Sequence, residues 1–355
     1  MMNDLPRTIE ELTPAWLTAA LAIRCPGIQV VSADVDHVIW GTATKILMTL
    51  KYADNSLPQC PPGKLCVKGE FDEKLRATLS GVTLTGTQVE AMFLNDIAPQ
   101  LGIPLLPHWY GASEPGMGII ILSNANETGI TFGSPVKDWS PDMVAKGLEI
   151  LARLHASTWG NSFAAVEWLT VGSEAVRQVY DVLMTEQHWA SHFKDPLAFQ
   201  LRPGLQDRER VMLALRALWA HNDTIAHSLI HGDAHLGNTC IDASGQPYFI
   251  DWAGPCRSSW AFDVAYFMSG ALSVANRRTH ETDLVSFYLD ALAGHGGPAL
   301  DRTEAWLDYR RNHLNGLIWA TLPSTLQPVE NVHAMSERYT TAINDHGSID
   351  LLLGR

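Results

Sequence analysis

The sequence predicts an α+β protein with two lobes: a small N-terminal lobe built on an antiparallel sheet with one main helix, and a larger, mainly helical C-terminal lobe. Three observations support this expectation. Short apolar runs rich in β-branched residues fill much of residues 1–122, and longer amphipathic segments with helical spacing follow in residues 123–355. The chain has 355 residues, of which 46% are hydrophobic, enough to bury two cores.

The N-terminal lobe begins with helix-start signals and a hairpin. The segments TIEE and TP within residues 8–14 predict a helix that ends near Leu21. Residues 28–38 predict a strand and residues 46–52 the strand that returns beside it. The connecting loop, WGTATK, offers the backbone of Gly41 and the hydroxyls of Thr42 and Thr44 as donors to phosphate oxygens. One glycine alone is weak evidence for phosphate binding.

The next segments complete the sheet and add its helix. The run KLCVKGE, residues 64–70, predicts a short strand that ends at Lys68. Residues 83–97 predict the main helix, with Glu90 on it, although a glutamate at such a position most often lies on a solvated face. Residues 106–111 and 117–122 predict two more strands, and the second, MGIIIL, is apolar enough to be central.

The most informative segment is HGDAHLGN at residues 231–238, which is followed by IDW at residues 250–252. Asp233 stands five residues before Asn238, and Asp251 stands thirteen residues after Asn238. A carboxylate that meets an acceptor hydroxyl, followed by an amide oxygen and a second carboxylate that hold Mg²⁺, is the order found in phosphoryl-transfer sites.

Two short strands are expected between the halves of this motif. Residues 238–242 and 246–250 are apolar and flank the turn DASG, so they predict a hairpin that returns Asp251 to the side of Asn238. For any single residue of the motif, a polar turn, a helix cap or the start of a loop is the more common explanation. The complete set at this spacing favours the phosphoryl-transfer site.

The pattern HGDxHxxN followed by DW resembles the aminoglycoside phosphotransferase and choline kinase superfamily, including its ecdysteroid-kinase-like branch, whose members have a protein-kinase-like fold. The resemblance implies that Asp233 is the catalytic base and that Asn238 and Asp251 bind Mg²⁺. It also implies ATP as the phosphoryl donor.

The resemblance assigns supporting residues too. It implies that Lys68 contacts the α- and β-phosphates of ATP and that Glu90 holds this lysine in place. His231 and His235 become scaffold residues of the catalytic loop, and Asp263 supports that loop from below. The spacing of His231 and His235 also occurs in zinc sites, but no third ligand of matching character lies nearby in the sequence, so zinc is the weaker interpretation.

A hinge at residues 122–126 divides a nucleotide-binding lobe, residues 1–122, from a catalytic and acceptor-binding lobe, residues 123–355. In such folds, backbone groups of the hinge contact the adenine, which makes Ser123 and Ala125 candidate nucleotide-binding residues. The segment SNAN departs from the acidic, leucine-containing linker usual in the family. The preference for ATP over GTP is therefore open at this point.

Helices dominate the rest of the chain. Residues 141–159 predict a long helix capped by Ser140, with His155 on its apolar stripe in a structural role. Residues 211–227 predict a helix that leads into the catalytic loop, and a further helix is expected to begin at Asp263.

Composition limits the partners. The net charge is −13, of which −4 falls in residues 1–122 and −9 in residues 123–355, so nucleic acid is not expected as the acceptor. The acidic lobe is compatible with a cationic amine, whereas the twelve tryptophans and the apolar residues 314–326 favour a bulky apolar alcohol over an aminoglycoside. Most of these tryptophans are expected in the core. The five scattered cysteines are typical of reduced thiols.

Three function classes follow. A small-molecule kinase is the leading one, with its acceptor unidentified. A protein kinase has less support, because the segment after Asp251 reaches the helix at Asp263 within about a dozen residues and leaves no room for an activation loop. A nucleotide-binding pseudokinase or interaction protein is the third, although no metal ligand or base is missing. We expect no membrane partner and a cytoplasmic location, because no apolar run is long enough for a membrane span or a signal peptide. A homodimer is compatible with all three classes.

Overall fold

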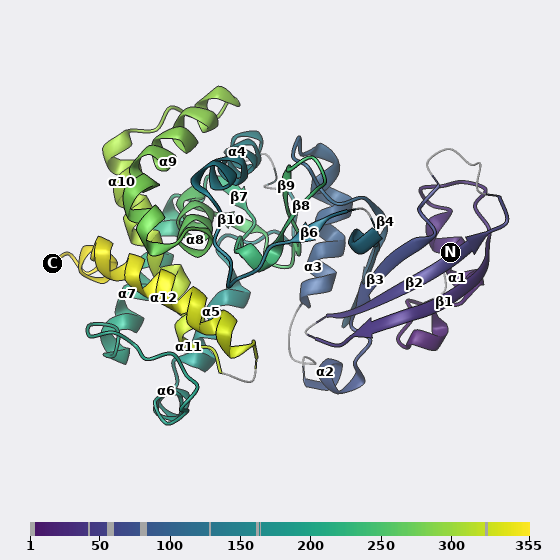
Figure 1. Ribbon diagram of the computed structural model, residues 1–355, viewed down its shortest axis with the longest axis horizontal. Coiled ribbons are helices and arrows are strands. Elements are labelled where there is room, and N and C mark those ends of the chain that lie inside the picture. Colours follow the sequence, from purple (N-terminus) through teal and green to yellow (C-terminus); the bar gives the residue numbers. More distant parts are fainter. Residues whose placement is uncertain are drawn as a thin grey trace. The chain divides into compact units, whose positions relative to one another are not determined.

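The computed structural model describes residues 4–41, 43–54, 60–78, 84–127, 129–160, 163, 165–323 and 326–355. Thr42, one of the expected phosphate-loop residues, lies outside the described residues. The contacts divide the chain into two compact units, the first comprising residues 1–131, 242–245 and 250–254 and the second comprising the remainder. The first is built on an antiparallel sheet and the second is mainly helical, which confirms the expected fold class (Figure 1).

Five strands form the sheet of the first unit in the order β1-β2-β3-β5-β4, and neighbouring strands are antiparallel. Their bounds are β1 Val30–Ile39, β2 Thr44–Tyr52, β3 Lys64–Gly69, β4 His108–Glu114 and β5 Met117–Ser123. Strand β5 pairs with both β3 and β4 and is almost wholly buried, as its unbroken apolar run predicts.

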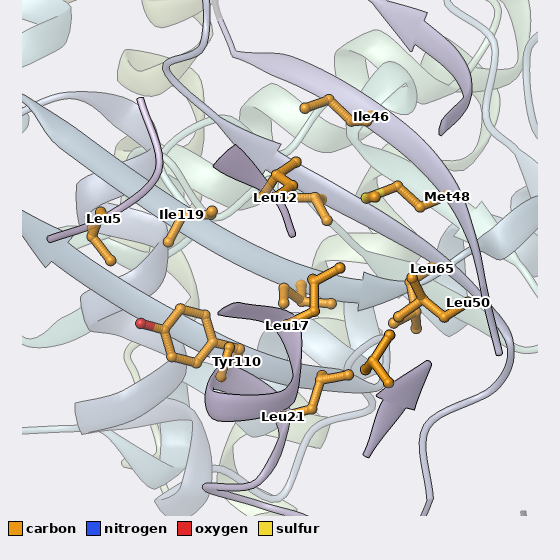
Figure 2. Packing of buried hydrophobic residues seen from close by; sticks show 14 of the residues in the cluster. Leu5, Leu12, Leu17, Leu21, Ile46, Met48, Leu50, Leu65, Tyr110 and Ile119 are labelled. Carbon is orange, nitrogen blue, oxygen red and sulfur yellow. The ribbon is translucent and has the colours of Figure 1, made fainter. Parts of the chain in front are cut away.

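One face of this sheet is covered by the N-terminal helix α1, Pro14–Leu21. Figure 2 shows Leu17 and Leu21 of α1 among the buried side chains of β2 and β3. The single helix expected from Thr8 onward is wrong, because the capping box of Thr8 closes a separate 3₁₀ turn, Ile9–Glu11, and Pro14 starts a new helix capped by Thr13.

Helix α3, Gly86–Met92, packs closely on β5. A Cβ atom on Gly118 would lie 2.3 Å from the backbone nitrogen of Gln88, so only glycine permits this approach. The expected continuous helix over residues 83–97 is wrong in its last part. After Met92 the chain widens into a π-helical turn, Phe93–Ile97, and Pro99 in the following turn cannot continue a helix because it lacks an N–H. A short helix, α2 Glu73–Thr78, precedes α3.

The second unit contains the remaining helices. They are α4 Pro141–Ser157, α5 Glu174–Leu183, α6 Glu186–His192, α7 Arg208–Thr224, α8 Trp260–Ala271, α9 Val274–Gly294, α10 Arg302–Asn312, α11 Leu317–Thr321, α12 Val329–His346 and α13 Ser348–Leu352. Helix α8 is buried along its whole length and contacts α4, α9, α10 and α12. It begins at Trp260 rather than at Asp263, because the side chain of Ser259 caps it. Among the described residues, no helix is long and apolar enough to cross a membrane.

Short strands of the second unit frame the loop at residues 231–238. Strand β7, Ser228–Ile230, pairs with β10, Cys256–Ser258, and leads directly into residue 231. Strands β8, Thr239–Ile241, and β9, Pro247–Phe249, form the expected hairpin, although each is only three residues long. Thr239 pairs with Phe249, so the hairpin opens at the residues that adjoin Asn238 and Ile250 in the sequence.

Candidate active site

Asp263 anchors the start of the loop at residues 231–238 in the second unit. This buried carboxylate on α8 accepts hydrogen bonds from the backbone N–H of His231 at 2.6 Å and of Gly232 at 3.0 Å. The Nε2 atom of His155, on α4, lies 3.4 Å from the same carboxylate. Gly232 adopts a φ of 80°, a conformation that glycine reaches without strain. The rigid helix therefore determines where the loop leaves β7.

The two histidines of the motif hold the loop from within. Nδ1 of His231 accepts a hydrogen bond from the backbone of Asp233 at 3.3 Å, and Nδ1 of His235 accepts one from the backbone of Gly237 at 3.0 Å. Because Nδ1 accepts in both rings, the neutral forms carry their proton on Nε2. Nε2 of His235 lies 3.6 Å from Oδ2 of Asp233 and thus directs its proton towards that carboxylate.

The carboxylate of Asp233 is held by two donors, one on each oxygen. Oδ1 accepts from the hydroxyl of Tyr266 at 3.3 Å, and Oδ2 accepts from the amide of Asn238 at 2.9 Å. The side chain is nevertheless 47% exposed, so a second molecule can reach it.

The surroundings of Asp233 favour its ionised form. Loss of water contact works against ionisation, but the neighbouring imidazoles of His235 and His231 outweigh that effect, and the Tyr266 hydroxyl adds to theirs. The pKa of Asp233 therefore lies below its usual value, and the group is an ionised acceptor at neutral pH.

Asn238 holds the carboxylate of Asp233 through its amide nitrogen, and its own amide oxygen is a potential cation ligand. Its Nδ2 atom donates to the backbone oxygen of Asp233 at 3.0 Å as well as to Oδ2 of that residue. With the amide nitrogen committed to Asp233, the amide oxygen is the atom of Asn238 that suits a hard cation. The loop is closely packed here, because a Cβ on Gly133 would lie 2.1 Å from the carbonyl oxygen of Leu236.

A separate group of ions lies in the first unit. Nζ of Lys68, on β3, is 2.6 Å from Oε2 of Glu90, on α3, and 2.6 Å from Oδ1 of Asp251. Lys68 and Glu90 are buried, whereas Asp251 is 34% exposed. Burial opposes the positive charge of Lys68, but the two carboxylates prevail and raise its pKa above the usual value. Burial raises the pKa of Glu90, with Lys68 acting in the opposite direction.

Asp251 has an unusual backbone conformation. Its φ of 62° makes it the one non-glycine residue with a positive φ in the described part of the chain. The next residue holds it there: the ring of Trp252 stacks on Phe93 of the π-helical turn with centroids 4.2 Å apart, and the backbone of Trp252 hydrogen-bonds to Glu90. A strained backbone supported by such contacts is typical of functional sites.

The expected nucleotide-contact residues are less clearly grouped. Gly41 is exposed in the turn before β2. Thr44 is not a loop residue as expected, because β2 begins with it; its buried hydroxyl has no hydrogen-bond partner among the described residues. The N–H of Ser123 donates to the carbonyl of Pro107, and its hydroxyl accepts from Trp109. Ala125 is buried and begins a 3₁₀ turn.

Two residues at this site escaped the sequence analysis. Tyr266 lies three residues after Asp263 on the same helix, and this spacing was the available signal, since residues three apart share a helix face. Trp319 donates its indole N–H to the hydroxyl of Tyr266 at 2.9 Å. No sequence pattern relates residue 319 to residue 266.

The family model described as "Phosphotransferase enzyme family" matches residues 127–306, which is half of the chain. The chain belongs to this family, and the protein is therefore a phosphotransferase. No curated protein matches the sequence.

Several solved structures are similar to this chain at low sequence identity. An ethanolamine kinase from Plasmodium vivax is 13% identical, with a TM-score of 0.52 over 91% of this chain and 83% of that one, and it supports the fold. A macrolide 2'-phosphotransferase from Brachybacterium faecium is 19% identical, with a TM-score of 0.44 over 93% and 97% of the two chains. The choline kinase LicA from Streptococcus pneumoniae is 12% identical, with a TM-score of 0.49 over 90% and 94%.

Proposed function

We propose that the protein is an ATP-dependent small-molecule kinase that transfers the γ-phosphate to a hydroxyl of a small alcohol or antibiotic-like acceptor. The observation that carries this proposal is the group of Lys68, Glu90 and Asp251, in which a buried lysine is shared by a buried and a half-exposed carboxylate. This is the arrangement by which kinases present a cation to the phosphates and a carboxylate to the metal.

The donor atoms fit magnesium. Asn238 offers an amide oxygen and Asp251 a carboxylate, both hard oxygen ligands, and Mg²⁺ commonly takes only one or two protein carboxylates with water and phosphate as its other ligands. When bound, the metal neutralises the charge of the phosphates. We assign Asn238 and Asp251 as its ligands. The residues of the motif provide no comparable set for zinc.

Asp233 acts on the acceptor. Its ionised, half-exposed carboxylate accepts the proton of the acceptor hydroxyl while the hydroxyl oxygen bonds to the γ-phosphorus and the bond to ADP breaks. His235, His231 and Asp263 keep the loop in place during this step. Lys68, fixed by Glu90, neutralises the α- and β-phosphates.

We also propose the lobe division at residues 122–126 and the contacts of the hinge with adenine. The chemical type of the acceptor is a further part of the proposal. The side chains around Asp233 in the second unit are aromatic: Tyr266 is in hydrogen-bond contact, and Trp319 packs edge-on against His235 with centroids 5.1 Å apart. These aromatic neighbours, although buried, support our preference for an alcohol with apolar bulk over a polycation.

The test is ADP formation from Mg-ATP with a panel of choline, kanamycin, a macrolide, a sterol and a short hydroxy acid. We expect turnover of an apolar alcohol, and turnover of kanamycin alone would contradict the acceptor preference.

Asp233→Asn keeps the hydrogen-bonding shape but not the base, so transfer is expected to fall by about 10³-fold or more while Mg-ATP binding persists. Ordinary activity in Asp233→Asn would show that the base is wrongly assigned. Nucleotide binding without any transfer would favour a pseudokinase.

A further inference from the structure

Two consecutive hydrogen bonds connect the interior of the second unit to Asp233. The indole Nε1 of Trp319 donates to the hydroxyl oxygen of Tyr266 at 2.9 Å, and this hydroxyl donates to Oδ1 of Asp233 at 3.3 Å. Trp319 and Tyr266 are both buried. The second distance is longer than a tight hydroxyl–carboxylate bond, which is common for catalytic groups before the reacting complex forms.

The directions of the two bonds are compatible. An indole N–H can only donate, so the oxygen of Tyr266 accepts from Trp319. The ionised carboxylate of Asp233 can only accept, so the single hydroxyl hydrogen of Tyr266 is directed at Oδ1. Without the indole, the hydroxyl oxygen of Tyr266 would lose the donor that helps to hold it in place.

The ring of Tyr266 is itself fixed. It stacks on Tyr339 of α12 with centroids 4.9 Å apart and planes inclined by 19°, and the hydroxyl of Tyr339 donates to the backbone oxygen of Tyr266 at 3.0 Å. Gly270, one helical turn further along α8, leaves room for Tyr339, since a Cβ there would lie 2.5 Å from its hydroxyl oxygen. Tyr266 therefore cannot move away from Asp233 without disturbing the core.

We infer that Tyr266, oriented by Trp319, is a positioning residue that fixes the carboxylate plane of Asp233 for the acceptor hydroxyl. Asn238 holds Oδ2 only, and a carboxylate held at one oxygen rotates in a broad torsional well. The second donor at Oδ1 removes that freedom. Small errors in the placement of reacting groups cost large factors in rate. This inference rests on the proposed function, in which Asp233 meets the acceptor.

The test compares Tyr266→Phe, Trp319→Phe and the double variant, with Mg-ATP and the panel alcohol that turns over, or with water as acceptor if none does. We expect Tyr266→Phe to lower kcat by about 10- to 100-fold with little change in KM for ATP. Trp319→Phe should cause a smaller fall in kcat. Because both variants break one series of contacts, the double variant should be no slower than Tyr266→Phe alone. Multiplying effects, or an unchanged kcat in Tyr266→Phe, would overturn the inference.

Tyr309→Phe is the matched control. It removes a buried phenol elsewhere in the second unit, whose hydroxyl donates to Oε2 of Glu281 at 3.1 Å and not to Asp233. We expect a lower Tm with an unchanged kcat, and an equal loss of kcat in Tyr309→Phe and Tyr266→Phe would indicate a purely structural role. Asp233→Asn distinguishes the positioning role of Tyr266 from the proposed function. If Asp233→Asn is inactive and Tyr266→Phe has normal activity, only the role of Tyr266 is wrong. If Asp233→Asn is active, the proposed function itself is wrong.

Discussion

Two buried cations, one in each compact unit, are both flanked by a pair of carboxylates, yet they differ in charge balance. Lys68 contacts Glu90 and Asp251, so one cation meets two carboxyl groups. Arg277 contacts Glu281 and Asp345, and Asp345 also binds Arg278, so two arginines meet two carboxyl groups. The first group therefore has one carboxyl group more than it has lysine or arginine cations, and the second does not.

The backbone that carries the ionic side chains also differs between the two groups. All four ionic residues of the Arg277 group lie on the helices α9 and α12, whereas Asp251 lies in a loop with a φ of 62°. A buried group of matched charges on helices is costly to break, and a group with an extra carboxyl on a strained loop is suited to a ligand. We therefore expect mutations in the two groups to separate activity from stability.

The Arg277 group is also not a metal site, although Glu281, His313 and His346 offer three ligand atoms close together. The rings of His313 and His346 are stacked with centroids 4.4 Å apart and planes inclined by 12°, so one ion cannot lie in both ring planes. Oε2 of Glu281 already interacts with Arg277, Tyr309 and His346. The cation of this group is the arginine itself.

The largest effect is expected for Asp251→Ala. It removes the carboxylate that we assign to the metal, so transfer should fall by about 10³-fold or more, and Mg²⁺ should no longer strengthen ATP binding. Both are measurable by initial rates and by calorimetric titration with and without magnesium. The matched variant Asp345→Ala should lower the Tm and leave kcat unchanged. Similar activity profiles for the two variants would remove the distinction between the groups.

A large effect of the opposite kind is expected for Arg277→Met. Removing one partner of a buried ion group typically costs about 3–5 kcal/mol, because charges remain buried without compensation. Urea unfolding should show this loss, with kcat per folded molecule unchanged. Lys68→Met should instead abolish transfer and cost less stability, because Glu90, whose pKa burial raises, can take up a proton. A larger stability loss in Lys68→Met than in Arg277→Met would contradict this assignment.

The sequence predicts this molecule well where the signal is local. Strand alternation, the apolar run of β5 and the spacing of Asp233 and Asn238 reflect neighbours in the chain, and the corresponding elements are present. The contact of Lys68 with Asp251 joins residues 183 positions apart, and the sequence analysis did not anticipate it. The bond from Trp319 to Tyr266 likewise depends on how α8 and α11 pack.

The differences between the predicted and the observed elements also arise from contacts between residues that are distant in the sequence. Thr44 was expected in a loop, but its pairing with Gly69 extends β2 by two residues. The last turn of the main helix becomes a π-helical turn where Phe93 meets Trp252, a residue from a distant loop. At Thr44 and at Phe93, contacts with residues distant in the sequence override the local conformational preference. Thr44 pairs with the neighbour of Lys68, and Phe93 follows Glu90 on the same helical segment.

An intermediate effect is expected where stacking supports the strained loop. Phe93→Leu removes the ring that lies on Trp252, a contact worth about 0.5–1.5 kcal/mol beyond its buried area. We expect Mg-ATP affinity to fall by up to about 10-fold, as measured by calorimetry, because Asp251 loses its support. Trp16→Leu disrupts another aromatic pair of the first unit, with Tyr110, and should affect Tm only. An equal loss of affinity in both variants would attribute the effect to general destabilisation.

The smallest effect concerns the pH dependence of stability at His313, which stacks on His346 beside the Arg277 group. His313 is buried; Nδ1 contacts the hydroxyl of Ser269 at 2.8 Å, and Nε2 has no hydrogen-bond partner among the described residues. Burial, followed by the charges of His346 and Arg277, holds the pKa of His313 well below its usual value. The unfolded chain, in which a histidine titrates at about 6.5, therefore binds a proton that the folded chain does not, and stability falls as pH drops below that value.

Over one pH unit, the loss of stability that His313 causes is at most about 1.4 kcal/mol, which is well below the cost of Arg277→Met. Urea unfolding at pH 7.5, 6.5 and 5.5 measures it. His313→Gln retains a partner for Ser269 but does not titrate, so its stability should be lower at pH 7.5 and decline less steeply on acidification. Equal slopes for the variant and the parent protein would show that His313 is not the group responsible. Because the proposed catalytic residues are unaffected, kcat at pH 7.5 should be the same in both proteins, which again separates the Arg277 group from the Lys68 group.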